Sequence, residues 1–322
     1  MIKTALQTLL TQAVEDDKLH GSLKCNEVLS RYTTWRIGGE AECFYQPESE
    51  ADLQMIFKLL PQATPIVWIG LGSNLLVRDG GVKGLIIYTN GVLNSLQIDC
   101  DNDDSQSCFI TAQAGVACAI FARKSAHKNI NGAEFLSGIP GTIGGALAMN
   151  AGAFGGETWR HVETVKMINQ VGEIICRTVD EFDVSYRAVD QRGRNEWFIS
   201  ANFKFPQDEQ GLLASKEKIK QLLKKRAETQ PTKQANAGSV FKNPEGDFAA
   251  RLIESCELKG FSINDAQVSP KHANFIINKA KARAIDVETL IVKIQETVFA
   301  KHQIKLQTEV KVIGEKKAEY ER

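Results

Sequence analysis

Residues 132–156 hold eight of the chain's 25 glycines, in the sequence GAEFLSGIPGTIGGALAMNAGAFGG. The glycine backbone is the most costly to order, so such a cluster predicts a chain that adopts φ > 0 or approaches another group closely. Apolar residues are interleaved with the glycines and predict a buried, shaped segment; they are Ile139, Pro140, Ile143, Leu147, Met149 and Phe154. A surface of this kind suits a large, flat cofactor that carries phosphate groups.

A second glycine-rich loop, GLGSN at residues 70–74, follows a predicted buried strand at 65–70. A dinucleotide-binding fingerprint of the Rossmann type requires a helix directly after its glycines. Here residues 75–88 predict a strand, a Gly-Gly turn and another strand, which excludes a Rossmann unit. The loop is therefore predicted to present consecutive backbone N–H groups to a phosphate group. The alternative for both glycine segments is a set of tight turns without a ligand.

Composition restricts the class of protein further. The 322 residues are 43% apolar and 24% charged, which is ordinary for a soluble chain of two or three domains. Lys plus Arg equals Asp plus Glu at 39 each, so no broad positive field for nucleic acid is expected. The apolar runs are too short for a membrane span, and residues 1–20 predict an amphipathic helix rather than a signal peptide. A cytoplasmic location is therefore expected.

The seven cysteines are scattered, odd in number and without a CxxC pair. This pattern argues against a disulfide framework, a zinc site or an iron–sulfur cluster, and no metal is expected. Most of the cysteines are expected to be small buried apolar residues. The chain also lacks a GxxxxGK[ST] loop, which excludes a nucleotide kinase.

The helical and strand patterns predict an α+β fold. Helices are expected at residues 49–62, 116–128, 212–231, 247–256 and 285–302. Strands are expected at 65–70, 92–100, 108–115, 196–205, 272–278 and 304–314, with a hairpin at 162–179 that turns at 170–173. Changes in sequence texture near 97 and 207 predict two subdomains that hold a cofactor between them, 1–97 and 98–207, and a smaller domain at 208–322.

Seven sequence blocks together resemble one family: TTWRIGG (33–39), IGLGSNLLV (69–77), SGIPGTIGGALAMNAGAFGGE (137–157), SYR (185–187), NAGSVFKNP (236–244), VSPKHANFIIN (268–278) and TEVKVIG (308–314). The chain is similar from about residue 20 to 314 to the UDP-N-acetylenolpyruvoylglucosamine reductases, flavoenzymes of peptidoglycan precursor synthesis. The resemblance implies a two-subdomain FAD-binding fold of the vanillyl-alcohol oxidase type plus a C-terminal α+β substrate domain. Because no large insertion follows Tyr186 and Arg187, it resembles the shorter form of the family, which lacks an extra loop over the substrate.

The resemblance implies that FAD is the cofactor. The glycine loops and Arg36 would hold its pyrophosphate, ribityl chain and flavin. The residues implied are Arg36, Gly70, Gly72, Ser73, Asn74, Ser137, Gly138, Ile139, Pro140, Gly141, Thr142, Gly144, Gly145, Asn150 and Gly152.

The implied reaction reduces the enolpyruvyl ether of UDP-N-acetylglucosamine to UDP-N-acetylmuramate. NADPH would reduce FAD, which would pass hydride to the vinyl carbon. Arg187 and Glu309 would stabilise the enolate-like intermediate at the substrate carboxylate, and Ser239 would protonate C2. Each residue has a plainer alternative: Ser239 as a turn residue, Glu309 as a solvated strand residue, and Arg187 as an ion-pair partner of Asp183 or Asp190.

Five further residues are implied as substrate contacts: Tyr186, Arg226, Lys242, Asn243 and His272. His272 is nearly as well explained as a satisfied core histidine. The lysines of the basic helix at 212–231 are expected to form a solvated face, whereas Arg226 and Lys233 are candidates for binding the substrate diphosphate. The chain departs from the family at 188–189, where Ala-Val replaces a common Asp-Ser pair.

Two other functions are compatible with parts of this pattern. Another FAD-dependent oxidoreductase of the same fold would act on a sugar or an alcohol, but its relatives often hold FAD through a His or Cys near the pyrophosphate loop, and no histidine lies near 70–74. A catalytically inactive binder of flavin or nucleotide sugar is disfavoured because Arg187, Ser239 and Glu309 are all present. A monomer or weak oligomer is expected, with no nucleic-acid or membrane partner.

Overall fold

A computed structural model describes residues 3–100, 107–206 and 211–317, with the side chains of 211–213 left aside. The chain forms two compact units, each built from separated segments. Unit 1 consists of Met1–Lys24, Phe44–Leu71 and Ile86–Lys225, and unit 2 of Cys25–Cys43, Gly72–Leu85 and Arg226–Arg322. The sequence predicted three consecutive domains, whereas each of these two units is formed by segments that are not consecutive. The three-domain division stays a prediction.

Unit 1 begins with two capped helices. Helix α1 (Ala5–Glu15) starts in a capping box formed by Thr4 and Gln7, and α2 (Glu50–Leu59) starts at Ser49, whose hydroxyl accepts a hydrogen bond from the Asp52 N–H at 3.1 Å. The carboxylate of Asp52 is buried and accepts hydrogen bonds from the Tyr45 hydroxyl at 2.6 Å and the His20 N–H at 2.9 Å. These bonds satisfy a charge that would otherwise be costly to bury.

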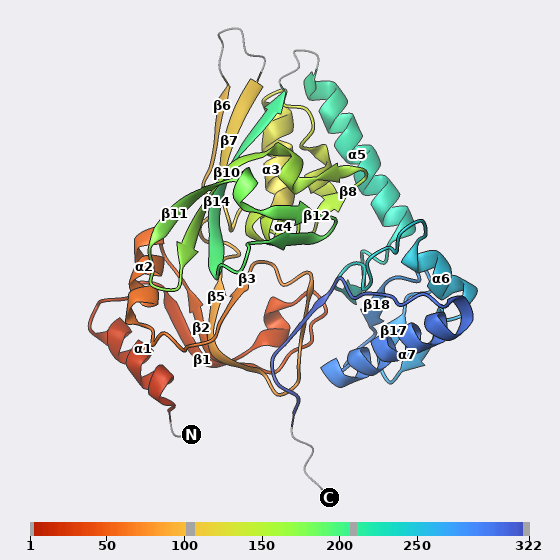
Figure 1. Cartoon of the computed structure of the whole chain (residues 1–322), viewed down its shortest axis with the longest axis horizontal. Coiled ribbons are helices and arrows are strands. Elements are labelled where there is room, and N and C mark those ends of the chain that lie inside the picture. The colour runs from red at the N-terminus through yellow and green to blue at the C-terminus, as the bar shows by residue number, and fades with distance from the viewer. Residues whose placement is uncertain (1–2, 101–106, 207–210, 318–322) are drawn as a thin grey trace, which may run out of the picture. The chain divides into compact units, whose positions relative to one another are not determined.

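A five-stranded sheet forms the centre of unit 1 (Figure 1). Its order is β11-β10-β14-β7-β6, and all its pairs are antiparallel. The strands are β6 (Leu96–Cys100), β7 (Ser107–Gln113), β10 (Val162–Asn169), β11 (Ile174–Thr178) and β14 (Glu196–Pro206). Helices α3 (Cys118–His127) and α4 (Ile143–Ala148) pack on it through an apolar core, in which Phe121 makes an edge-to-face contact with Phe203 at 5.1 Å.

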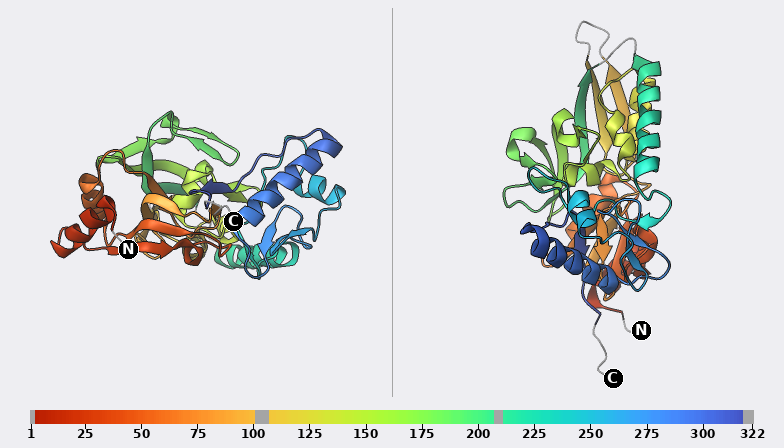
Figure 2. Two further views of the ribbon diagram at one scale, coloured as in Figure 1. Left: turned by 90° about the horizontal axis from the view of Figure 1, so that it is seen from below. Right: turned by 90° about the vertical axis from the view of Figure 1, so that its right-hand side faces the viewer.

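Short elements connect this core to the glycine-rich segment. The 3₁₀ turns are η2 (Glu134–Gly138), η3 (Thr158–His161) and η4 (Val179–Glu181), and β8 (Gly152–Ala153) pairs with β9 (Gly156–Glu157). A hairpin of β12 (Asp183–Ser185) and β13 (Ala188–Asp190) lies in the same unit. Helix α5 (Gly211–Thr229) is continuous and passes from unit 1 into unit 2 (Figure 2).

A four-stranded sheet has the order β1-β2-β5-β3. Its strands are β1 (Ser22–Val28), β2 (Glu40–Gln46), β3 (Ile66–Ile69) and β5 (Val82–Tyr88). The boundaries between the units fall within β1, β2 and β5, so the chain passes repeatedly from one unit into the other. The predicted strand, turn and strand after residues 70–74 are confirmed as β4 (Leu75–Val77) and β5, which confirms the exclusion of a Rossmann unit.

Unit 2 packs α6 (Ala249–Ser255) and α7 (Ala284–His302) with a sheet of order β15-β18-β17-β16. Those strands are β15 (Ala235–Asn236), β16 (Ser262–Ile263), β17 (Ala266–Val268) and β18 (Ile276–Asn278), and η1 (Leu29–Tyr32) belongs to the same unit. Strand β19 (Lys311–Ile313) pairs in parallel with β4, although more than 200 residues separate them. Asp79, just after β4, accepts hydrogen bonds from the Ala284 and Ile285 N–H groups at the start of α7.

Two strand predictions in unit 2 are wrong in extent. The strand expected at 304–314 is regular only in β19, and the one expected at 272–278 only in β18. Before β19, the main chain at Gln307 and Glu309 bonds to the Val240–Lys242 segment, which is a loop with one isolated bridge at Phe241. The alternation of apolar residues at 304–314 therefore reflects the burial of Leu306 and Val310, but it does not indicate a continuous β-strand.

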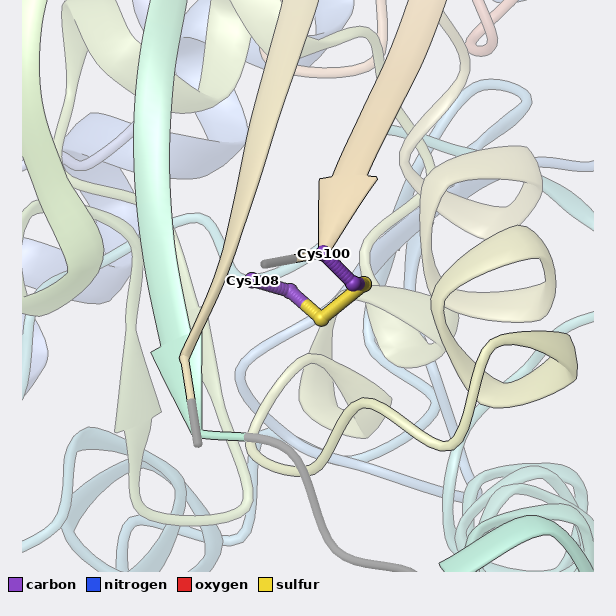
Figure 3. Close-up of a disulfide and its surroundings, with 2 residues drawn as sticks. All are labelled: Cys100 and Cys108. Atoms are coloured by element: carbon purple, nitrogen blue, oxygen red, sulfur yellow. A yellow bond between two sulfur atoms is a disulfide. The ribbon is translucent and has the colours of Figure 1, made fainter. Parts of the chain in front are cut away.

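The interpretation of the cysteines needs correction. Cys100 and Cys108 form a disulfide between β6 and β7 (Figure 3). The two residues are paired directly across the antiparallel strands, with Cα atoms 4.2 Å apart, and only the strand register reveals this. Cys43 and Cys118 are buried as expected, whereas Cys176 is exposed. Within the described residues, no cluster of three His, Cys, Asp or Glu is suited to a metal, and no helix has the length and apolarity of a membrane span.

Candidate functional site

The glycine-rich segment of unit 1 uses its glycines for close approach more than for unusual backbone angles. In residues 132–156 only Gly132 and Gly155 have φ in the left-handed region among the glycines. A Cβ added at Gly138 would lie 2.6 Å from the Phe154 ring, and one at Gly152 would lie 2.4 Å from the Gly156 carbonyl oxygen. Such distances leave no room for a side chain, so these glycines permit the packing.

The expected burial of the interleaved apolar residues holds only in part. Ile143 and Leu147 are fully buried, because they lie on the inner face of α4. Pro140 and Phe154 are exposed, and the prediction that they are buried is wrong. The Phe154 ring packs against the backbone of Gly138, and this contact accounts for a large apolar residue at an exposed position.

Gly70 and Thr142 bring the two predicted cofactor segments together within unit 1. A Cβ at Gly70 would lie 2.3 Å from the Thr142 hydroxyl oxygen. That oxygen is buried and has no hydrogen-bond partner in the described part of the chain. A buried hydroxyl normally has a partner, so a ligand atom at this point would complete it. Gly145 lies nearby and is exposed. A Cβ added at Gly145 would have one described neighbour within 4 Å, the Thr142 hydroxyl at 3.9 Å. These features fit a large polar cofactor lying along the backbone.

Arg187 occupies a two-residue hairpin turn with Tyr186, because Ser185 pairs directly with Ala188. Its φ is +55°, a left-handed conformation that is uncommon for a residue with a side chain and that concentrates at functional sites. Its guanidinium donates to the carbonyl oxygens of Asn150 at 3.3 Å and Gly152 at 2.6 Å. The hairpin therefore ties Arg187 to the end of the glycine-rich segment.

The side chains around Arg187 are ordered in defined ways. The guanidinium lies 5.0 Å from the centre of the Tyr186 ring, which is 44% exposed. Asn150 has φ of +45°, donates to the Ser185 carbonyl at 3.1 Å and accepts from the Trp159 N–H at 3.1 Å, so it holds the hairpin against the segment. Asp183, one alternative ion-pair partner for Arg187, instead pairs with Arg192 at 2.9 Å.

Two predicted cofactor segments meet within unit 2. The Thr34 N–H donates to the Gly72 carbonyl at 3.2 Å, and a Cβ at Gly72, where φ is +68°, would lie 2.0 Å from the Tyr32 carbonyl oxygen. Trp35 anchors this region by donating its indole N–H to the Ile276 carbonyl at 2.7 Å. Arg36 is exposed and has φ of +58°, next to an anchored residue. Ser73 is half-buried in the adjoining loop.

The same unit brings together two of the three predicted catalytic residues. The Glu309 N–H donates to the Val240 carbonyl at 2.8 Å, which places the residue after Ser239 against Glu309. The Asn74 side-chain amide donates to the Glu309 carbonyl at 3.1 Å, and the Lys311 N–H donates to the Asn74 carbonyl at 3.0 Å. Ser239 and Glu309 are both half-buried. The plainer alternative for Glu309, a solvated residue of a regular strand, does not describe this position, because Glu309 precedes β19, is half-buried, and its main chain is hydrogen-bonded to Val240 and Asn74.

One residue that the sequence reasoning missed supports Ser239. The buried side chain of Asn274 accepts from the Phe241 N–H at 3.0 Å and donates to the Phe241 carbonyl at 2.8 Å, and its own carbonyl accepts from the Val240 N–H at 2.9 Å. Asn274 thus fixes the chain just after Ser239. Its position within the block at 268–278 was the available signal.

The predicted substrate residue His272 is integrated into the fold of unit 2. Its Nδ1 accepts from the Asn274 N–H at 3.3 Å, and its ring packs edge-to-face on Phe275 at 4.8 Å. Burial lowers the pKa of the imidazole, with a further lowering by nearby Lys259. These contacts agree with the alternative of a satisfied histidine, and a substrate contact stays a prediction.

The other predicted substrate residues of unit 2 differ in how they are held. The Lys242 N–H donates to the carbonyl of Gln307, two residues before Glu309, at 2.9 Å. Asn243 accepts from the Ala249 N–H at 3.1 Å and so caps the start of α6, a structural use that the sequence reasoning did not anticipate. Arg226 is half-buried near the end of α5, and burial lowers the pKa of its guanidinium, whereas the nearby Lys224 and Lys225 are exposed.

Comparisons with known proteins agree with this arrangement. The model of the UDP-N-acetylenolpyruvoylglucosamine reductase C-terminal domain matches residues 230–313, and an FAD binding domain model matches residues 41–176. The UDP-N-acetylenolpyruvoylglucosamine reductase of Legionella pneumophila (strain Corby) is 51% identical over 296 residues, covering 92% of this chain and 93% of that protein. The reductase of the same name from Coxiella burnetii (strain Dugway) is 47% identical over 310 residues, covering 92% and 97%.

A solved structure extends the similarity to three dimensions. The crystal structure of UDP-N-acetylenolpyruvylglucosamine reductase from Thermus caldophilus has a TM-score of 0.74 at 28% identity, covering 91% of this chain and 99% of that one. With the family models, it confirms the predicted fold class, an α+β chain with an FAD-binding fold and a C-terminal α+β domain. FAD as the cofactor is confirmed as well.

Proposed function

Because the chain belongs to the UDP-N-acetylenolpyruvoylglucosamine reductase family, and is therefore an FAD-containing oxidoreductase, we propose that it uses NADPH to convert enolpyruvyl-UDP-N-acetylglucosamine into UDP-N-acetylmuramate. FAD, when bound, supplies hydride to the vinyl carbon of the substrate. The product retains the ether link and gains one hydride at the vinyl carbon and one proton at C2. A monomeric or weakly oligomeric state and a cytoplasmic location belong to the same proposal.

Backbone groups bind the cofactor in this proposal. The loop at 70–74 offers N–H groups to the pyrophosphate, and the buried hydroxyl of Thr142 has a polar partner to gain. The open space at Gly145 accommodates a ligand along the segment. The exposed guanidinium of Arg36 supplies positive charge beside the loop at 70–74. Gly145 would thus act sterically, by leaving space for the cofactor, whereas Gly138 and Gly152 permit close packing within the protein.

Side chains carry the proton and the charge of the reaction. Ser239 donates a proton to C2 of the substrate, and Arg187 and Glu309 bind the carboxylate on which negative charge develops. Glu309 helps there only when its carboxyl is protonated and donates a hydrogen bond, because a carboxylate would repel the substrate. The main-chain bond between Glu309 and Val240, next to Ser239, is the single observation that best supports this proposal.

The substrate nucleotide is assigned to the remaining basic and polar residues. Arg226 is half-buried in the last turn of α5 and is proposed to bind the diphosphate. Lys242, Tyr186 and His272 are proposed to contact the sugar and its substituents, while Asn243 contributes by its cap at α6 as well.

Anaerobic stopped-flow spectroscopy of the FAD-loaded protein tests the proposal. Flavin absorbance near 450 nm should be lost on mixing with NADPH and restored by enolpyruvyl-UDP-N-acetylglucosamine without oxygen. UDP-N-acetylglucosamine is the matched control, because it lacks only the enolpyruvyl group and should restore nothing. Loss without restoration by the enolpyruvyl ether would favour another oxidoreductase of the same fold, and a failure of NADPH to reduce the flavin would reject the proposed reductant.

A further inference from the structure

The side chain of Asn74 is turned toward the proposed catalytic residues of unit 2. Its Nδ2 donates to the Glu309 carbonyl at 3.1 Å, and its own carbonyl accepts from the Lys311 N–H at 3.0 Å. The resemblance to the family implied a role for Asn74 in the loop that binds FAD, in which only its backbone N–H would take part. The structure adds a role for its side-chain amide.

We propose that Asn74 is a positioning residue that orients Glu309 for catalysis. The proposal rests on the proposed function, since it requires Glu309 to act on the substrate. Glu309 lies two residues before β19, the strand that pairs in parallel with β4, and both its N–H and its carbonyl are hydrogen-bonded. Its N–H donates to Val240 at 2.8 Å and its carbonyl accepts from Asn74 at 3.1 Å.

The two bonds hold the two peptide units that flank the Glu309 Cα. The N–H to Val240 belongs to the Thr308–Glu309 peptide, and the carbonyl that accepts from Asn74 belongs to the Glu309–Val310 peptide. With both peptides held, the direction of the Glu309 Cα–Cβ bond has little freedom. Loss of the Asn74 bond leaves the carbonyl without this donor and allows the peptide to tilt. A displacement of about 1 Å at a reacting group can lower a rate by about 10²-fold, whereas the bond itself contributes little to stability.

Substitutions at residue 74 separate the amide donor from the backbone of the loop. Asn74→Asp keeps the size and the backbone N–H but replaces the donor with a carboxylate oxygen, which repels the Glu309 carbonyl. Asn74→Gln keeps the donor on a side chain that is one methylene longer. Asn94→Asp is the matched control, because the Asn94 amide also donates to a main-chain carbonyl, that of Gly91 at 3.2 Å, in an exposed turn of unit 1.

The test measures the two half-reactions of the FAD-loaded full chain separately by anaerobic stopped-flow. For Asn74→Asp we expect the reoxidation of the flavin by substrate to slow by about 10- to 100-fold. FAD content, reduction by NADPH and KM for the enolpyruvyl substrate should stay within about twofold, and Asn74→Gln should recover part of the rate. Asn94→Asp should match the wild type throughout. A thermal unfolding curve for each variant checks that the fold is kept.

Glu309→Ala and the double variant Asn74→Asp/Glu309→Ala separate the failure of this inference from that of the proposed function, because alanine cannot donate the hydrogen bond assigned to Glu309. If Glu309→Ala reoxidises at the wild-type rate, the proposed role of Glu309 is wrong. If Glu309→Ala is slow but Asn74→Asp is not, only the role of Asn74 is overturned. The inference predicts that the double variant is no slower than Glu309→Ala, and multiplication of the two defects would contradict it. A loss of FAD content in Asn74→Asp would instead assign the side chain to cofactor binding.

Discussion

Two regions of the molecule use the main chain in different ways. They are the glycine-rich segment at 132–156 and the cluster formed by Asn74, Ser239, Val240 and Glu309. In the first, the absence of side chains lets the chain approach Phe154 and Gly156 closely. In the second, main-chain hydrogen bonds hold residues that we propose to carry the chemistry. The first region depends on the absence of side chains, and the second depends on hydrogen bonds that hold its residues in place.

This difference predicts two kinds of mutational effect. Adding a methyl group should damage the glycine-rich segment through sterics, with losses of folding or of FAD affinity. Removing a hydroxyl or a carboxyl should leave folding and FAD binding in place and should slow a chemical step. The predictions below test this separation, beginning with the largest expected effect.

Ser239→Ala removes the proposed proton donor and should lower kcat by about 10²- to 10⁴-fold, the usual contribution of a positioned acid. Reoxidation of the flavin by substrate, followed by stopped-flow, measures this step. Ser255→Ala is the control in the same unit, because the Ser255 hydroxyl bonds to the Leu252 carbonyl and to His302 and has no role in the proposal. A wild-type rate for Ser239→Ala would reject Ser239 as the acid.

Gly152→Ala should destabilise unit 1 by about 1–3 kcal/mol, the typical cost of overpacking. The new Cβ would lie 2.4 Å from the Gly156 carbonyl oxygen, between two paired strands, and 2.9 Å from Nη1 of Arg187. Urea unfolding of the apoprotein measures the loss. An unchanged midpoint would mean that β8 and β9 shift freely, and the steric account of this segment would then fail.

Gly145→Ala sharpens the comparison, because the apoprotein has room for the added methyl group. The new Cβ meets only the Thr142 hydroxyl at 3.9 Å, and alanine favours a helix by about 1 kcal/mol over glycine. Apoprotein stability should therefore be equal or higher, while the Kd for FAD, measured by fluorescence titration, should rise by about tenfold if the cofactor takes that space. An unchanged Kd would remove Gly145 from the cofactor site.

The smallest effect concerns pH. Burial against Phe205 at 4.2 Å and Phe135 lowers the pKa of His161 below its usual value of 6.5. Below pH 6.5 the unfolded chain therefore binds a proton that the folded chain does not, so the contribution to stability is present above that pH and is lost as the pH falls. His161→Phe should reduce the fall in urea midpoint between pH 7 and 5. An equal fall in both proteins would contradict this assignment.

Local sequence patterns predicted much of the fold. The Ser49 cap of α2, the turn at 170–173 and the strand directly after residues 70–74 all depend on neighbouring residues, and all are confirmed. The parallel pairing of β4 with β19 and the Cys100–Cys108 bond depend on register between strands, which the sequence alone does not specify. The same holds for the segments that alternate between the two units.

The sequence offered candidate site residues but not their geometry. The glycine segments were identified from the residues themselves and the Ser, Arg and Glu positions from the resemblance, whereas alternation at 304–314 alone placed Glu309 on a solvated strand face. The structure instead bonds its peptide to Val240 and Asn74, residues distant in the sequence. Asn274 was missed because a buried asparagine whose side chain bonds to the main chain of a residue distant in the sequence has no signature in its neighbouring residues.

The most direct test of the separation between the two regions is to measure both half-reactions of Ser239→Ala under anaerobic conditions. We expect wild-type FAD content, wild-type reduction by NADPH and a reoxidation by the enolpyruvyl substrate that is slower by about 10²-fold or more. Equal slowing of both half-reactions, or loss of FAD, would show that Ser239 supports the cofactor rather than the proton transfer, and would contradict the account.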